Sequence, residues 1–120
     1  MSIFFPVVIH HNPNCGTSRG VLALIEDAGL KPVIVEYLTT GWTKPYLQSL
    51  FAAASATARQ MLRETHSPAE ELGLLADGVQ EDALLDAMVA HPILVNRPIV
   101  VTPKGTRLCR PSEFVRALLP

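Results

Sequence analysis

The chain has 120 residues, 48% of them hydrophobic, and its ten basic and eleven acidic side chains leave a net charge of −1. This length suits one domain, the hydrophobic fraction excludes a disordered chain, and the charge balance argues against electrostatic binding of nucleic acid or of an anionic membrane. The sequence shows no apolar run long enough for a membrane span, no signal peptide and only two cysteines, so we expect a cytoplasmic protein with free thiols.

A strand-helix-strand unit is predicted at the start of the chain. Residues 6–10 are apolar and rich in β-branched side chains, which is typical of a buried strand. Residues 17–28 repeat apolar side chains at helical spacing, and Gly29 suits the end of a helix. Residues 33–38 predict a second strand, which a right-handed crossover would place parallel to the first.

The middle of the chain predicts helices. Thr43 can cap a helix with an apolar stripe, and a further helix is predicted over residues 55–63. The sequence SPAE at residues 67–70 has the pattern of a capping box with proline at the first helical position, so we expect a helix to begin there. Apolar side chains in residues 81–90 predict a helix that ends before Pro92.

The C-terminal part predicts a β-hairpin followed by a helix. Residues 99–102 and 106–109 are strand-like and flank a Pro-Lys-Gly turn, and residues 112–119 predict the last helix. One parallel pair and one hairpin make an α/β fold with a four-stranded mixed sheet, which is the thioredoxin-like arrangement (βαβ plus C-terminal ββα). We expect one domain over residues 1–120, with a helical insertion over about residues 43–91.

Cys15 lies where the first predicted strand passes into the first predicted helix. Sites in open α/β sheets form at the carboxyl ends of strands, and a helix N-terminus offers unpaired N–H groups and partial positive charge. A thiol there has a lowered pKa, which nearby His11 and Arg19 would lower further, whereas the alternative is a small buried cysteine. The same turn would cradle a tetrahedral oxyanion with the N–H groups of Gly16, Thr17 and Ser18.

The remaining candidate groups are one thiol, two arginines and the histidines. Residues 15–18 read C-x-x-S, so they lack a resolving cysteine, and Cys109 is either a buried thiol or a resolving thiol for Cys15. Arg97 and Arg110 lie at predicted strand ends, where they are either surface charges or bidentate anion ligands. The bond between Arg97 and Pro98 is a candidate cis peptide. The histidines and cysteines lack metal-ligand spacing, so we expect no metal site.

Two blocks resemble the glutaredoxin- and glutathione-dependent arsenate reductases: HNPNCGTSR at residues 11–19, and residues 91–103 continuing through 106–113. The resemblance covers nearly the whole chain and implies a thioredoxin-like fold with a helical insertion. It implies that Cys15 is the nucleophile, that His11 keeps its thiol ionised and that Ser18 lies near it. It also implies that three arginines hold the oxyanion. These are Arg97, Arg110 and Arg63, the last assigned in preference to Arg59 by order and spacing within residues 59–63.

The resemblance further implies an enzyme of arsenical resistance. The Cys15 thiolate would attack arsenate, glutathione would act as co-substrate and glutaredoxin would reduce the adduct, so that arsenite leaves; no bound cofactor is expected. Two alternatives share this fold. One is an Spx-type regulator that binds RNA polymerase, although such proteins usually carry C-x-x-C. The other is a monothiol glutaredoxin-like oxidoreductase, which has no need of Arg97 or Arg110.

Overall fold

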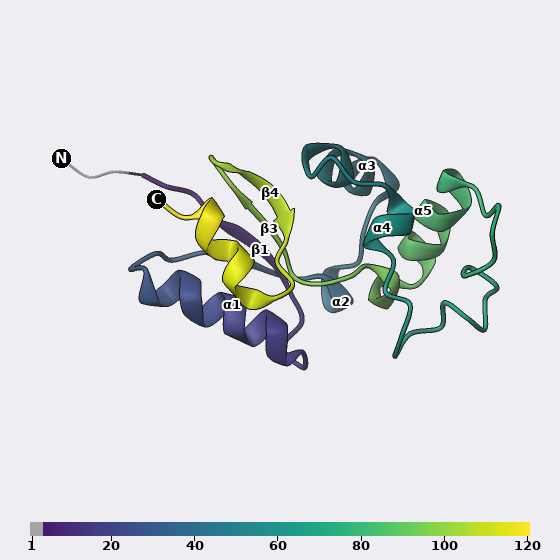
Figure 1. Cartoon of the computed structure of the whole chain (residues 1–120), viewed down its shortest axis with the longest axis horizontal. Helices are drawn as coiled ribbons and strands as arrows, with labels where there is room; N and C mark the ends of the chain where they lie inside the picture. Colours follow the sequence, from purple (N-terminus) through teal and green to yellow (C-terminus); the bar gives the residue numbers. More distant parts are fainter. Residues whose placement is uncertain (1–3) are drawn as a thin grey trace. The chain divides into compact units, whose positions relative to one another are not determined.

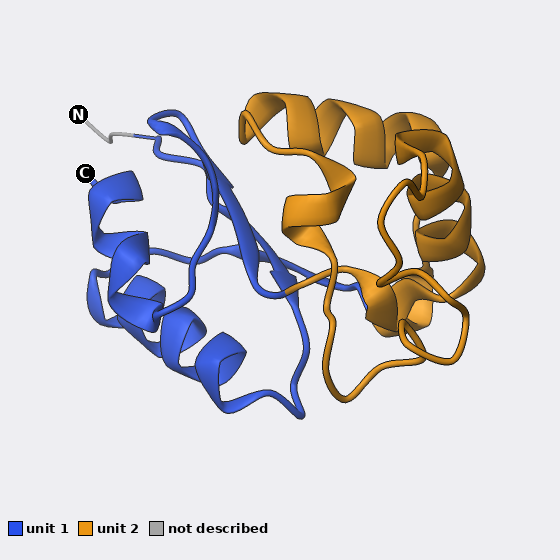
Figure 2. Ribbon diagram, turned by 45° about the vertical axis from the view of Figure 1, so that its right-hand side comes forward, with its two compact units in different colours: residues 1–37, 97–120 blue, residues 38–96 orange. Residues whose placement is uncertain are grey.

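The computed structural model describes residues 4–120, and the chain forms two compact units (Figure 2). Unit 1 joins the two ends of the chain, Met1–Tyr37 and Arg97–Pro120, and unit 2 is the intervening segment Leu38–Asn96. The insertion predicted over residues 43–91 falls within unit 2. That the whole chain acts as one domain stays a prediction.

Unit 1 contains a four-stranded sheet in the order β2-β1-β3-β4 (Figure 1). Its strands are β1 (Val8–His11), β2 (Val33–Glu36), β3 (Ile99–Thr102) and β4 (Gly105–Leu108). β1 pairs with β2 in parallel, while the pairs β1–β3 and β3–β4 are antiparallel. The predicted mixed sheet is therefore confirmed, and β1 lies inside it, so that its carboxyl end is flanked by strands on both sides.

Two helices of unit 1, α1 (Gly16–Asp27) and η2 (Ser112–Leu118), pack side by side against the sheet (Figure 1). η2 is a 3₁₀ helix. Apolar side chains from both helices and from β1 and β3 are buried together, which removes their surface from water and stabilises the layer. The buried members of this core are Val7, Ile9, Val21, Ile25, Val100, Cys109, Val115, Leu118 and Leu119.

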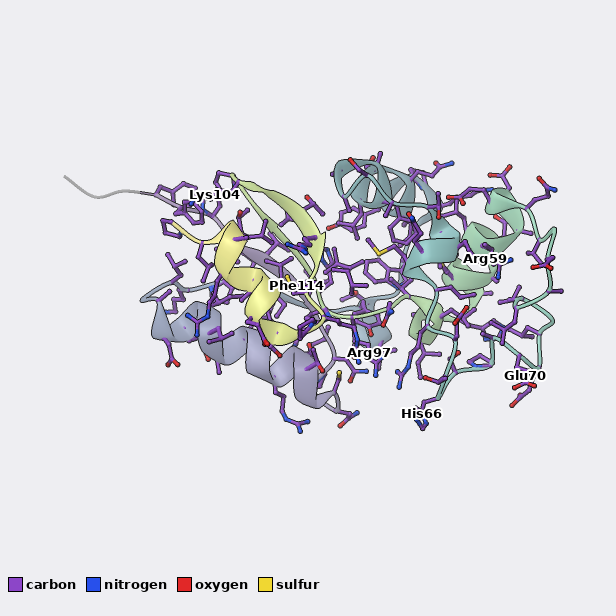
Figure 3. All side chains as sticks on the ribbon, in the orientation of Figure 1. Arg59, His66, Glu70, Arg97, Lys104 and Phe114 are labelled. Carbon is purple, nitrogen blue, oxygen red and sulfur yellow. The ribbon has the colours of Figure 1, made fainter. Side chains whose placement is uncertain are left out.

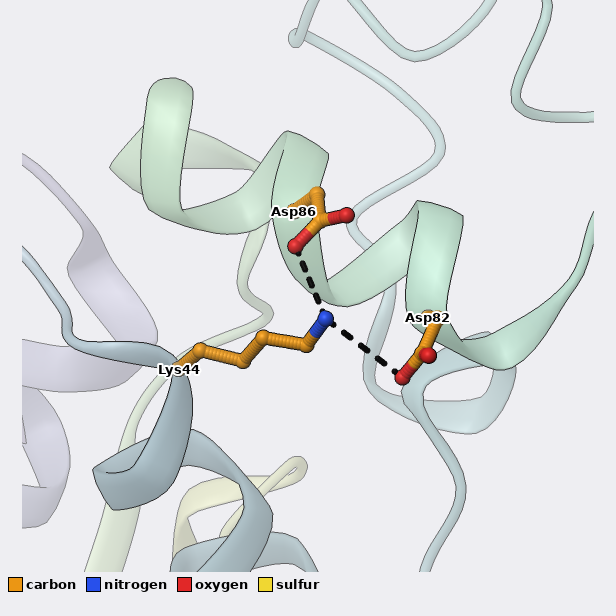
Figure 4. A network of polar contacts seen from close by, with 3 residues as sticks. All are labelled: Lys44, Asp82 and Asp86. Carbon is orange, nitrogen blue, oxygen red and sulfur yellow. Dashed lines mark ion pairs between the residues drawn. The ribbon is translucent and has the colours of Figure 1, made fainter.

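Unit 2 is helical. Its elements are α2 (Tyr37–Thr40), which begins at the last residue of unit 1, α3 (Lys44–Ala53), α4 (Ala58–Met61), α5 (Glu81–Ala90) and the 3₁₀ helix η1 (Pro92–Leu94). The predicted cap is confirmed, because the Thr43 side chain accepts a hydrogen bond from the Tyr46 N–H. Lys44 at the start of α3 forms ion pairs with Asp82 at 3.5 Å and Asp86 at 3.0 Å on α5 (Figure 4).

The first strand begins at Val8 and not at residue 6. Two further boundaries are wrong, one because of tertiary burial and one because of the local backbone. The second strand ends at Glu36 and not at residue 38, since Tyr37 starts α2 and its ring is fully buried. The helix predicted over residues 55–63 is shorter. Ser55 has a positive φ of 53°, which a helix does not accept, and α4 begins only after Thr57, whose side chain forms a capping box with Gln60.

The helix predicted to begin at residues 67–70 is absent, and the segment instead forms successive turns. Ser67 Oγ accepts a hydrogen bond from the Ala69 N–H and donates to the Arg63 carbonyl, so its hydroxyl bridges two parts of a loop. Gly73 has a φ of 72° and ends the turn. A serine whose hydroxyl hydrogen-bonds to the backbone of a turn occurs in the same sequence pattern as a serine that caps a helix.

Candidate active site

Cys15 lies directly between β1 and α1, at the position that caps the helix. Its backbone is extended, with φ −102° and ψ 122°. Its N–H donates to the Asn12 carbonyl at 3.0 Å, and its own carbonyl accepts from the Arg19 N–H at 3.0 Å. The side chain is 8% exposed. The thiol therefore sits at the N-terminus of a 12-residue helix, as the sequence predicted.

Two arginines act on this thiol, Arg110 through a direct contact and Arg97 through its charge. Arg110 Nη1 donates to Cys15 Sγ at 3.7 Å and to the Arg97 carbonyl at 3.1 Å. The Cys109 N–H donates to the Pro98 carbonyl at 2.9 Å and so holds the two arginine-bearing segments together. Arg97 precedes β3 (Figure 3), and its bond to Pro98 is cis, as predicted. The bond between Arg110 and Pro111 is cis as well, which the sequence analysis did not predict.

These surroundings lower the pKa of the Cys15 thiol. Burial alone would raise the pKa, but the backbone N–H groups of Ser18 and Thr17 and the charges of Arg97 and Arg110 outweigh it. Each of these groups stabilises the thiolate more than the neutral thiol. The site therefore combines a thiol of lowered pKa with positively charged groups that attract an anion.

His11 contacts Ser18 within the same turn. The distance from His11 Nδ1 to Ser18 Oγ is 2.6 Å, and Ser18 Oγ also accepts from the Asn12 N–H at 3.1 Å. The pKa of His11 is lowered, mainly by burial and further by Arg19, although Glu36 acts in the opposite direction. A neutral imidazole is therefore favoured at pH 7, and the contact to Ser18 ties it to the first turn of α1. Its role in keeping Cys15 ionised stays a prediction.

Gly16 and Thr17 form the start of α1, where the Thr17 N–H acts on the Cys15 sulfur. Their role in binding an oxyanion stays a prediction. The sequence predicts that Arg19 lowers the pKa of the Cys15 thiol, but Arg19 is not among the groups that do so. Its Nη1 donates to the Pro13 carbonyl at 2.8 Å and stabilises the loop. The sequence analysis missed the part played by Asn12, whose Oδ1 accepts from the Asn14 N–H at 2.9 Å. The sequence signal is the asparagine itself, because an asparagine side chain often accepts a hydrogen bond from the backbone N–H two residues further on and so stabilises a turn.

Arg63 and Arg59 both belong to unit 2. Arg59 is bound to a loop, since its Nη1 donates to the Leu74 carbonyl at 2.7 Å and its Nη2 to the Ala76 carbonyl at 3.1 Å (Figure 3). Arg63 Nε donates to the Thr65 carbonyl at 3.0 Å, close to its own backbone. Both side chains therefore donate to loop carbonyls within unit 2. The sequence assigns the role of third anion ligand to Arg63. That role stays a prediction.

Cys109 is fully buried in the core of unit 1. Its Sγ donates to the Arg107 carbonyl at 3.6 Å. Burial raises the pKa of the Cys109 thiol to about 12, with a small opposing effect from Arg107. Both cysteines are free thiols. These observations favour the reading of Cys109 as a small apolar core residue over that of a resolving thiol.

Residues 4–120 contain no group of three or more His, Cys, Asp or Glu side chains that could hold a metal ion. In the same residues, no helix is both long enough and apolar enough to span a membrane.

A thiol of lowered pKa at a helix N-terminus, in contact with Arg110 and under the charge of Arg97, defines a class of protein that performs thiol chemistry on an anion. The comparisons with known proteins agree. The ArsC family model matches residues 10–118. Arsenate reductase ArsI2 of Synechocystis sp. is 64% identical over 113 residues, which cover 94% of this chain and 81% of that protein. Arsenate reductase of Escherichia coli (strain K12) is 52% identical over 114 residues, covering 95% of this chain and 81% of that protein.

A solved structure also matches the chain. Arsenate reductase from Vibrio cholerae superposes with a TM-score of 0.91 and 39% sequence identity, over 96% of this chain and 98% of that one. The chain belongs to the ArsC family, so the resemblance in its sequence and its thioredoxin-like fold are both confirmed.

Proposed function

We propose that this chain reduces arsenate to arsenite through a covalent adduct on Cys15, with electrons from glutathione and glutaredoxin. The observation that carries the proposal is the 3.7 Å contact from Arg110 Nη1 to Cys15 Sγ at the N-terminus of α1. It places a nucleophile beside a group that binds oxyanions. The arsenate reductases that are 49–64% identical to the chain support the choice of substrate.

In the first step, the Cys15 thiolate attacks arsenic, an As–S bond forms, and one arsenate oxygen leaves as water after taking up protons. The guanidinium groups of Arg97 and Arg110 and the N–H groups of Gly16 and Thr17 would neutralise the remaining oxygens. Arg63 would supply a third guanidinium. His11 and Ser18 would hold the turn in the form that keeps the thiol ionised.

In the second step, glutathione displaces another oxygen and forms a second As–S bond. A glutaredoxin thiolate then attacks the glutathione sulfur, and the electron pair of that As–S bond passes to arsenic. Arsenic is thereby reduced from As(V) to As(III), while glutaredoxin and glutathione are oxidised to a mixed disulfide. Water finally releases arsenite and restores Cys15. Both reductants belong to reducing compartments, so the proposal includes a cytoplasmic location.

The two alternative functions make different demands on the site. A glutaredoxin-like oxidoreductase would exchange thiols with small disulfides and would keep that activity without Arg97 or Arg110. A regulator would bind RNA polymerase and would not turn over arsenate. The contact of Arg110 with Cys15 and the charge of Arg97 acting on the same thiol favour the arsenate reaction over both.

A coupled assay tests the proposal. Arsenate-dependent NADPH oxidation is measured with glutathione reductase, glutathione and glutaredoxin, and each thiol is then omitted in turn. We expect turnover with the full mixture and almost none without glutathione or glutaredoxin. Turnover that persists without glutaredoxin would refute that partner alone. No turnover with arsenate, together with rapid glutathione–disulfide exchange or capture of polymerase, would move the function to the corresponding alternative.

A further inference from the structure

A close contact joins α1 to the start of η2 within unit 1. Ser112 Oγ donates to the Thr17 carbonyl at 3.2 Å, in the first turn of α1. Gly20 lies one turn further along the same helix face. A Cβ built on Gly20 would lie 3.0 Å from Ser112 Oγ and 3.6 Å from Ser112 Cβ. The start of η2 therefore approaches α1 as closely as it does because residue 20 has no side chain.

The same segment carries one of the site's arginines. Arg110 is two residues before Ser112, and its Nη1 donates to Cys15 Sγ at 3.7 Å. The hydroxyl of Ser112 holds the carbonyl of Thr17, two residues after Cys15. Residues 110–112 thus contact the Cys15 turn at two points, one through the sulfur and one through the backbone. Because only one residue separates Arg110 from Ser112, a shift of the backbone at one of them also moves the other.

We propose that Gly20 and Ser112 are positioning residues, whose close contact sets the distance between the Arg110 guanidinium and the Cys15 sulfur. Neither residue touches the sulfur. They act through the placement of Arg110 on one side and of the first turn of α1 on the other. The effect on the thiol is independent of the substrate, whereas the effect on arsenate turnover rests on the proposed function.

Two single variants and their combination test the proposal. In Gly20→Ala the added methyl group pushes Ser112 away, and in Ser112→Ala the hydrogen bond to Thr17 is lost. We expect the pH profile of iodoacetamide alkylation of Cys15 to shift to higher pH in both. We also expect kcat/KM for arsenate to fall about tenfold, since misplacement of a catalytic group by 1 Å can cost about 100-fold. The double variant is expected to lose less than the two single effects combined, because both remove one contact.

The control is Gly29→Ala at the opposite end of α1. Gly29 has a φ of 81° and no atom within 4 Å of a Cβ built there, so alanine strains the backbone without crowding the site. We expect this variant to melt at a lower temperature and to keep the alkylation profile of the wild type. Gly20→Ala should keep a folded α1, because alanine favours helices more than glycine does.

The proposal is overturned if folded Gly20→Ala, or folded Ser112→Ala, shows the alkylation profile of the wild type. If the profiles shift as expected while the wild type does not turn over arsenate, the positioning role stands and the proposed function fails. The thiol measurement therefore separates the two conclusions.

Discussion

At the residue scale, the two cysteines show that position decides the chemistry of a thiol. Cys15 lies at a helix N-terminus, where backbone N–H groups, the charge of Arg97 and the contact with Arg110 lower its pKa despite burial. Cys109 lies in an apolar core, which raises its pKa to about 12. The thiolate is the reactive form, so only Cys15 should react at neutral pH.

The first expected result follows from this contrast. Brief treatment of the native protein with iodoacetamide at pH 7 should label Cys15 and leave Cys109 unlabelled. The rate at Cys15 should rise with pH to a midpoint below that of an ordinary thiol, because its pKa is lowered. Mass spectrometry of peptides gives the site of labelling. Denatured protein is the control, in which both cysteines should react, and equal labelling in the native protein would contradict the assignment.

A second expected result concerns the arginines. Arg97→Lys keeps the positive charge but replaces a planar, bidentate donor with a point charge. We expect kcat/KM for arsenate to fall by about tenfold or more, since loss of one oxyanion donor commonly costs about 100-fold or more in rate. Arg116→Lys, a change on the exposed side of η2, is the matched control and should behave as the wild type. An Arg97→Lys protein with unchanged kinetics would remove Arg97 from the site.

At the scale of elements, the sequence predicted the four strands and most of the helices. The periodic apolar patterns of α1, α3 and α5 mark the faces that are buried, and the Thr43 cap is a local signal. The main errors fall at residues 37–38, 55–57 and 67–70. There tertiary burial of Tyr37, a positive φ at Ser55 and a loop bridged by Ser67 decide the backbone, and none of these is visible in local spacing.

The loop between α4 and α5 gives the third expected result. Arg59 donates to two of its carbonyls, and hydrogen bonds from a charged group contribute about 1.5–3 kcal/mol each. Arg59→Met should therefore open the loop and increase the rate of limited proteolysis there by at least about tenfold, which is the effect of losing one of the two bonds. Arg63→Met, the matched variant, also loses a hydrogen bond to this loop, at the Thr65 carbonyl, so the two variants are compared by arsenate turnover, which Arg63→Met should lower more. The opposite pattern would transfer the anion role to Arg59.

At the scale of the whole molecule, the net charge of −1 gives no general attraction for anions. Recognition must therefore come from the arrangement of a few groups. The sequence located Cys15, His11, Ser18, Arg97 and Arg110, because they lie in two recognisable blocks. It could not show that Arg110 contacts the sulfur or that Gly20 and Ser112 meet, since these residues come from distant parts of the chain.

A fourth expected result tests this arrangement without catalysis. Cys15→Ser cannot form the thiol adduct but keeps the arginines, so arsenate should still raise its melting temperature. A ligand at 100 times its Kd stabilises a folded protein by about 2.7 kcal/mol. Adding Arg110→Met to this variant should remove most of the shift. A shift that is equal with and without Arg110 would show that arsenate binds elsewhere.

The measurement that tests the central claim most directly compares the two cysteines in one arsenate-reduction assay. Cys15→Ser and Cys109→Ala are assayed beside the wild type with glutathione and glutaredoxin present. We expect Cys15→Ser to be inactive, because a serine hydroxyl stays protonated and is a poor nucleophile, and we expect Cys109→Ala to turn over arsenate wherever it folds. Turnover by Cys15→Ser at the wild-type rate would contradict the role of Cys15.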